Sequence, residues 1–200
     1  MKHRISDLLQ QFHQYGKLAN VAEIARRYFA MNAFDGALTM IGVLMGNFTA
    51  GVDTPRIVVS TGLATSVAMG ISGLWGAYLT EAAERKREIT EISEQVLIDL
   101  HDTRIGKASR FAVAVVAVVD GISPALAALI ILSPFFIADL FGQIQFVYFS
   151  ALGMALLSLF ALGAFLGTVS KENVFLYGLR TVVAGLVSIG ISYLLGAPGE

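Results

Sequence analysis

Residues 111–137 read FAVAVVAVVDGISPALAALIILSPFFI and contain one charged side chain, Asp120. An apolar run of this length reaches the roughly 20 residues that a helix needs to cross the hydrocarbon core of a bilayer. A second intramembrane Asp-Gly pair, Asp35-Gly36, lies in another apolar run. A carboxylate in a membrane span is expensive and usually faces a protein interior or a water-filled path. Both pairs are therefore candidate functional positions.

The composition of the whole chain is that of a membrane protein. Of its 200 residues, 56% are hydrophobic and 14% are charged, whereas a soluble domain has about 25% charged residues. The mean hydropathy is +0.70. Cysteine is absent and the net charge is −1. We therefore expect a lipid bilayer as the surrounding medium, no thiolate metal site and no nucleic acid as a partner.

Five apolar stretches are each long enough to span a bilayer. They cover residues 33–51, 57–79, 111–137, 144–169 and 174–195. Before them, residues 1–30 have helically spaced apolar positions and form a predicted amphipathic helix. Strong helix formers continue the second span through residues 80–100, followed by a return through 101–109. The predicted fold is all-α: a polytopic membrane protein with an N-terminal amphipathic helix and a five-helix domain over residues 31–200.

The placement of basic residues predicts the orientation of the chain. If the five spans alternate in direction, every lysine and arginine except Arg56 lies on the side of the N-terminus. Cytoplasmic loops are enriched in these residues. We therefore expect a cytoplasmic N-terminus, a cytoplasmic helical extension over residues 80–109 and a C-terminus on the outer side.

The first span places an acid and a hydroxyl on one helical face with small residues. Asp35, Thr39, Gly42, Gly46 and Thr49 follow one another at steps of three and four residues. A Gly-xxx-Gly pair lets a second helix approach closely. One interpretation is a polar transport path that includes Asp35 and Thr39. The alternative is helix packing, with Asp35 near the interface.

In the third span, Asp120 is followed four residues later by Pro124. Proline has no N–H, so the carbonyl of Asp120 loses its helical partner. A carbonyl and a carboxylate oxygen together suit a divalent cation such as Mn²⁺. The same carboxylate can also carry a proton. The alternative is a simple kink, with Asp120 hydrogen-bonded to a neighbouring helix.

The second span offers two weaker candidates. Met69 is a soft ligand or a gap-filling core residue. Glu81 is the member nearest the membrane of a stripe that includes Glu84, Glu88 and Glu91. That stripe either collects cations at a pore mouth or is a solvated helix surface with ion pairs. The resulting candidate metal ligands are Asp35, Asp120, Glu81 and Met69.

Nothing in the sequence has the arrangement of a catalytic site. The three histidines are scattered, and no nucleophile elbow, phosphate loop or HExxH motif is present. We therefore expect a protein that is not an enzyme and that binds no cofactor tightly.

Three segments together resemble the vacuolar iron transporter family. Asp35-Gly36-Ala37-Leu38-Thr39 is similar to the motif of that family's first helix. Gly76-Ala77-Tyr78-Leu79-Thr80, continuing to Glu84-Arg85, is similar to the run where the second helix leaves the membrane. Gly178-Leu179-Arg180, with Gly185 and Ser192-Tyr193-Leu194-Leu195-Gly196, is similar to the last helix. By motif match, Asp35 takes the position of the family's pore acid.

The resemblance implies a homodimer of five-helix subunits with a polar path near the dimer axis. It also implies export of Fe²⁺ or Mn²⁺ from the cytosol, coupled to protons. The chain departs from the family at two positions of the second helix, where Gly73 and Ala77 replace Met and Glu. The family's larger cytoplasmic metal-binding helices are absent as well. Two alternatives therefore remain: a non-transporting membrane scaffold with the same fold, and a transporter of another small cation.

Overall fold

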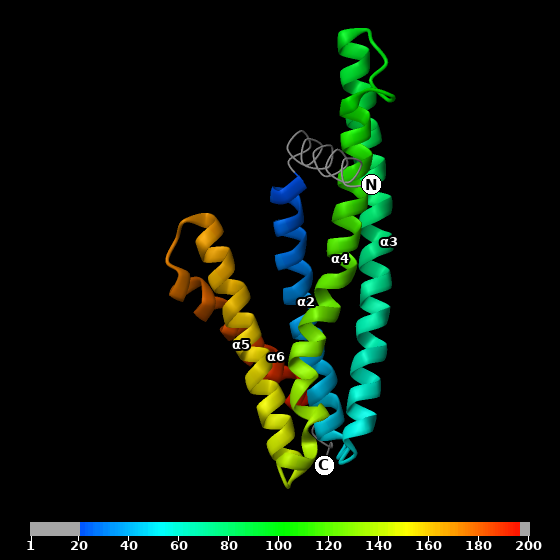
Figure 1. Ribbon diagram of the computed structural model, residues 1–200. Coiled ribbons are helices and arrows are strands. Elements are labelled where there is room, and N and C mark those ends of the chain that lie inside the picture. Colours follow the sequence, from blue (N-terminus) through cyan, green and yellow to red (C-terminus); the bar gives the residue numbers. More distant parts are fainter. Residues whose placement is uncertain (1–20, 197–200) are drawn as a thin grey trace, which may run out of the picture. The chain divides into compact units, whose positions relative to one another are not determined.

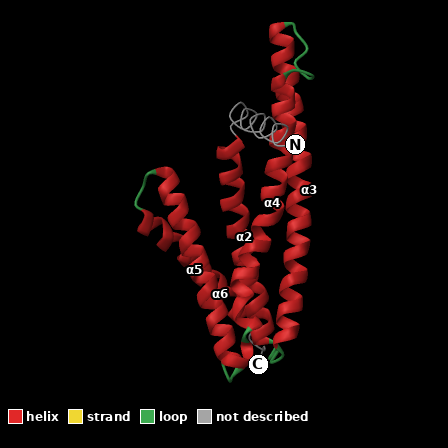
Figure 2. Ribbon diagram, in the orientation of Figure 1, coloured by secondary structure: helices red, strands yellow, loops and turns green. Residues whose placement is uncertain are grey.

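The protein is built from long helices. A computed structural model describes residues 21–196, and no strand is present among them (Figures 1 and 2). The elements are α2 (Val21–Thr49), α3 (Pro55–Val96), α4 (Arg104–Phe136), the short 3-10 helix η1 (Ala138–Leu140), α5 (Ile144–Ser170) and α6 (Val174–Gly196). Each of the five α-helices is long and apolar enough to cross a membrane. The predicted all-α class is confirmed, and the described residues contain five helices with the length and apolar composition predicted for the spans.

The helix bounds differ from the sequence prediction at two places, whereas the long second helix agrees with it. Residues 21–30 belong to α2, so the predicted boundary at residue 30 is not a helix end; the rest of the predicted amphipathic helix lies outside the described residues. The second span does continue as one helix, to Val96. The predicted return over 101–109 is mostly helical, because α4 begins at Arg104.

The described chain divides into two compact units. The first unit consists of the residues up to Phe29 together with Ile71–Ile122, and the second of Ala30–Gly70 together with the residues from Ser123 onward. Helices α2, α3 and α4 each contribute one part to each unit. Of the predicted site residues, Asp120 and Glu81 belong to the first unit, and Asp35, Thr39 and Met69 belong to the second.

The second unit has the larger apolar core. Ile41, Leu44 and Leu132 are completely buried in it. Tyr148 of α5 is also buried, and its hydroxyl donates a hydrogen bond of 2.8 Å to the carbonyl of Val52. This bond ties the beginning of α5 to the turn between α2 and α3.

Glycines permit close helix contacts in the second unit. A Cβ added at Gly36 of α2 would lie 2.7 Å from the Cα of Pro124 in α4. In the pair α5 and α6, Cβ atoms at Gly163, Gly178 and Gly185 would collide with the facing helix. Small residues at such positions let helices associate where lipid removes the hydrophobic driving force.

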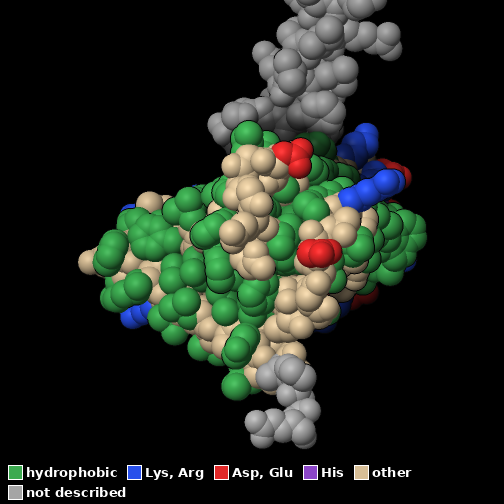
Figure 3. Space-filling model, turned by 90° about the horizontal axis from the view of Figure 1, so that it is seen from below, with side chains coloured by type: hydrophobic (Ala, Val, Ile, Leu, Met, Phe, Trp, Pro, Cys, Tyr) green, Lys and Arg blue, Asp and Glu red, His purple; other side chains and the backbone are tan. Residues whose placement is uncertain are grey.

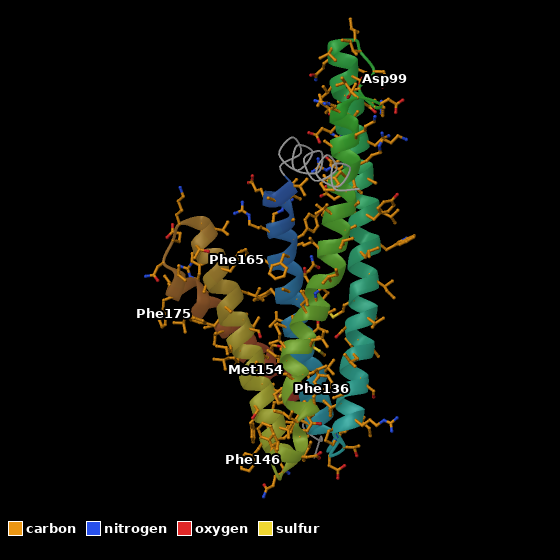
Figure 4. The ribbon with its side chains drawn as sticks, viewed as in Figure 1. Asp99, Phe136, Phe146, Met154, Phe165 and Phe175 are labelled. Carbon is orange, nitrogen blue, oxygen red and sulfur yellow. The ribbon has the colours of Figure 1, made fainter. Side chains whose placement is uncertain are left out.

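The first unit is an antiparallel hairpin of α3 and α4 together with the first turns of α2. Ala77, Val116 and Ala117 form a small buried cluster, with Ile24 and Tyr28 packed against it. The two long helices are joined by residues 97–103, where Asp99 projects from the tip of the hairpin (Figure 4). Gly106 contacts the backbone of His101 so closely that a Cβ would not fit.

The surface is apolar over much of its area. Large exposed side chains include Trp75, Leu157 and Leu195, at 62%, 60% and 82% exposure. Apolar side chains also dominate the face seen in Figure 3. A soluble monomer rarely exposes apolar surface of this extent, and the distribution is compatible with an integral, multi-pass membrane protein.

Candidate functional site

Asp120 of α4 is buried, with 6% of its surface exposed. Two of its oxygens face Gly73 of α3. A Cβ added at Gly73 would lie 3.0 Å from the carboxylate Oδ2 and 3.1 Å from the Asp120 carbonyl oxygen. A side chain at position 73 would therefore occupy the space into which both oxygens point. Gly73 is one of the two positions at which the sequence departs from the family that it resembles.

Pro124 affects the helical hydrogen bonding around Asp120, as the sequence indicates. Pro124 lies inside α4, which continues through it, and proline has no N–H to donate to the carbonyl four residues earlier. The carbonyl oxygen is thus turned to Gly73 beside the carboxylate. A carboxylate and a carbonyl oxygen on one short stretch of helix provide two hard oxygen donors.

Glu81 of α3 is held by two partners. It accepts a hydrogen bond of 2.9 Å from the Tyr28 hydroxyl through Oε1, and its Oε2 lies 3.3 Å from Arg85 Nε. The side chains of Glu81 and Arg85 are only 14% and 12% exposed. A partly buried charge is normally paired in this way, because desolvation of an isolated carboxylate is costly.

The outer part of the glutamate stripe is a solvated ion-pair surface. Glu91 receives a hydrogen bond of 2.7 Å from Arg87 Nε, and both side chains are more than half exposed. Such exposed pairs, four residues apart on a helix, contribute only a few tenths of a kcal/mol. This arrangement fits the solvated-surface alternative for Glu91.

Asp35 of α2 is exposed, although its neighbour Gly36 is buried against Pro124. Gly42 and Gly46 share its outward face, and a Cβ added at either would meet nothing within 4 Å. Thr39 on this face is partly exposed. Unlike Asp120, this acid points away from the core of its own unit.

The described residues do not gather the predicted ligands into one site. Met69 is partly buried, and the buried sulfur that has a polar neighbour is that of Met40, 3.9 Å from the Ser66 hydroxyl. Between residues 21 and 196, no group of three or more histidine, aspartate or glutamate side chains is arranged to hold a metal ion. Of the candidates, Asp120 and Glu81 belong to the first unit, and Asp35, Thr39 and Met69 belong to the second.

Sequence reasoning missed two residues of this region. Tyr28 lies within residues 1–30, for which the sequence predicts only an amphipathic helix, whereas its hydroxyl donates a hydrogen bond to Glu81. Gly73 counted as a lost ligand, whereas it provides the space for Asp120. Both contacts join residues far apart in the chain, 53 positions in the case of Tyr28 and Glu81. The sequence therefore gives only a weak signal for either.

Comparison with known proteins shows a relative that matches most of the chain. No protein-family model matches the chain. The uncharacterized protein MJ0645 of Methanocaldococcus jannaschii is 30% identical over 172 residues, which cover 84% of this chain and 86% of MJ0645. The chain belongs to the MJ0645 family. Because the match extends over most of both proteins, this family is defined by nearly the whole chain rather than by a shared segment.

Proposed function

We propose that this member of the MJ0645 family is a membrane transporter for divalent metal ions, Fe²⁺ or Mn²⁺, rather than an enzyme. The observation that supports it best is the buried Asp120, whose carboxylate Oδ2 and carbonyl oxygen both lie against Gly73. An acid buried within a membrane span is a functional candidate, and hard oxygen donors suit Mn²⁺ and Fe²⁺ better than Cu⁺. The motif around Asp35, which resembles the first helix of vacuolar iron transporters, supports the same proposal.

Asp35 provides the second acid of the proposed path. In a single chain it lies on an exposed face of a membrane-spanning helix, where a charged side chain is unfavourable. A second copy of the chain that covers this face would remove Asp35 from lipid and place two such acids near one axis. We therefore include a homodimer in the proposal, with Asp35 and Thr39 lining the path and with Met69 and Glu81 as accessory ligands.

The proposed direction is export from the cytosol in exchange for protons. Asp35 and Asp120 bind either a cation or protons, so that the inward movement of protons drives the metal outward.

The basic residues support a cytoplasmic N-terminus. Because the chain has no cysteine, single cysteines at Asp99 and Gln143 test the orientation. An impermeant maleimide applied outside cells should label position 143 and not position 99.

A flux assay in proteoliposomes tests the function. We expect Mn²⁺ uptake by the wild-type chain to fall to the level of empty liposomes when Asp35 and Asp120 are both changed to Asn. The matched control changes two acids outside the proposed path, Asp102→Asn with Glu172→Gln, and should retain transport. Normal uptake by the Asp35→Asn, Asp120→Asn variant would refute the proposed mechanism.

A non-transporting scaffold is the second candidate. Two observations favour it: Ala77 is packed in an apolar cluster where the resembled family has Glu, and both oxygens of Glu81 already have partners. Partners would then bind the exposed part of α3. Calorimetric titration with Mn²⁺ and Fe²⁺ separates the two functions, since the transporter should bind one of them at micromolar concentration and a scaffold should bind neither.

A further inference from the structure

A basic cavity lies between α3 and α4 of the first unit, apart from Asp120. It has a volume of about 430 Å³. Its charged lining consists of Arg85, Lys86 and Arg110, with His101 at one edge, and no acidic residue lines it. The remaining lining includes the apolar side chains of Ile89 and Val113 and the ring of Tyr78. The cavity lining therefore combines basic and apolar side chains.

The acids around the cavity leave part of this positive charge unneutralised. Glu81 is bonded to Arg85, and Asp99 is bonded to His101. Asp102 is 3.9 Å from Arg110, but both side chains are largely exposed, and such a pair is worth little. Lys86 has no ion pair among the described residues. An anion can thus bind Lys86, and also Arg110, whose ion pair with Asp102 is long and exposed.

The cavity lies where both helices change from charged to apolar sequence. In α3 there is no charged residue between Arg56 and Glu81, and in α4 none between Arg110 and Asp120. The exposed rings of Trp75 and Tyr78, with centroids 6.4 Å apart, mark the same level. Aromatic residues are enriched at the membrane–water interface. Anionic phospholipids, which have a charged headgroup and apolar tails, are available at the membrane–water interface.

We propose that the cavity binds the phosphate headgroup of an anionic phospholipid. Lys86 and Arg110 bind the phosphate oxygens, as basic pockets between membrane helices do. Ile89 and Val113 contact the less polar glycerol region. The lipid would be a specific partner of the hairpin, distinct from the surrounding bilayer and independent of any transported ion.

Trp75 is the only tryptophan of the chain, and its ring neighbours Tyr78 of the cavity wall. It therefore reports on lipid exchange at this place. The full chain is reconstituted in brominated phosphatidylcholine, which quenches tryptophan fluorescence, and unbrominated phosphatidylglycerol or phosphatidylcholine is added. We expect phosphatidylglycerol to relieve the quenching several-fold more effectively than phosphatidylcholine does.

Variants locate the site. Lys86→Gln and Arg110→Gln, both at exposed positions, should each lower the preference for phosphatidylglycerol about fivefold, as expected for about 1 kcal/mol per basic residue near a membrane surface. Arg85 is left unchanged because it also holds Glu81. Lys171→Gln, in the turn between α5 and α6, is the matched control and should keep the wild-type preference.

Three results would overturn the proposal. They are equal displacement by the two lipids, an equal loss of preference in the Lys171→Gln control, and full preference in the Lys86→Gln, Arg110→Gln double variant. Inorganic phosphate at millimolar concentration distinguishes the sources of the anion. If it competes with phosphatidylglycerol for the cavity at that concentration, the ligand is a soluble phosphate and the assignment to a lipid is wrong.

Discussion

Gly73 of α3 lies against two oxygens of Asp120, the carboxylate Oδ2 and the carbonyl oxygen. A methyl group there would lie 3.0 Å from Oδ2. We expect Gly73→Ala to displace the carboxylate and to reduce Mn²⁺ transport at least about tenfold, the scale seen when a ligand loses its support.

The matched control for this prediction is Gly76→Ala, the same substitution in the same helix. A Cβ at Gly76 meets nothing within 4 Å, so proteoliposomes with this variant should transport Mn²⁺ at the wild-type rate. Equal rates for Gly73→Ala and the wild type would show that Asp120 is not positioned through Gly73. A lower rate for both variants would instead indicate a general effect on α3.

At the scale of single residues, the sequence indicates which side chains have unusual chemistry but not which of them are buried. It predicted that Asp120 is unusual, because an acid before an intrahelical proline is visible as a pattern. It did not predict that Asp120 is buried and Asp35 exposed, since both have the same Asp-Gly context. Which face of a helix is buried depends on contacts with segments far away in the chain, such as that of Gly36 with Pro124.

Among the elements, the contact of α2 with α4 in the second unit depends on Gly36. A methyl group would lie 2.7 Å from the backbone Cα of Pro124, which has no flexible side-chain end to give way. We expect Gly36→Ala to destabilise the protein by about 1–3 kcal/mol, as overpacking does. The thermal unfolding midpoint in detergent should fall for Gly36→Ala. It should not fall for Gly153→Ala, where a Cβ meets nothing within 4 Å.

The tip of the α3–α4 hairpin should respond to pH. Asp99 accepts hydrogen bonds from the backbone N–H of His101 and then from its ring, and these bonds lower the pKa of the Asp99 carboxyl. Because the folded pKa is depressed, the stabilisation is present above the ordinary aspartate pKa of about 3.9. It is lost as pH falls through the lowered value.

Amide hydrogen exchange measures this effect. The protection factor of the His101 amide should be constant from neutral pH down to about pH 5, above the ordinary aspartate range, and should decrease in more acidic solution. In Asp99→Ala, which has no side-chain acceptor, it should be low throughout and independent of pH. Unchanged protection in that variant would show that the carboxylate does not hold the tip.

The helices themselves were predictable because long apolar runs between polar turns need no tertiary information. The start of α5 at Ile144 and that of α6 at Val174 agree with the predicted spans. The beginning of α4 was not predicted, because Arg104 to Arg110 is too polar for a span and was interpreted as a return. Helix continues there because the segment packs on α3, with Gly106, Ala108 and Ser109 buried.

For the whole molecule, the exposed position of Asp35 is the strongest reason to expect a second copy. Asp35 is the third residue of the predicted span over residues 33–51, near its cytoplasmic end. A charged side chain that faces lipid is unfavourable even there. Gly42 and Gly46, with open space around them, would let the α2 helices of two chains approach closely and cover it.

We therefore expect the wild-type chain to be a dimer in light scattering of the detergent-solubilised protein, and the Gly42→Leu, Gly46→Leu variant to be a monomer. Leucine at these positions meets no atom of its own chain near its Cβ, so the fold should persist while the close approach of two helices is blocked. Gly190→Leu, at an equally open glycine of α6, should remain dimeric.

Because Asp35 lies on the same face of α2, the monomeric variant should also lose Mn²⁺ transport. A wild-type chain that stays monomeric at every concentration, or a Leu variant that dimerises as well as the wild type, would mean that this face of α2 is covered by something other than a second copy.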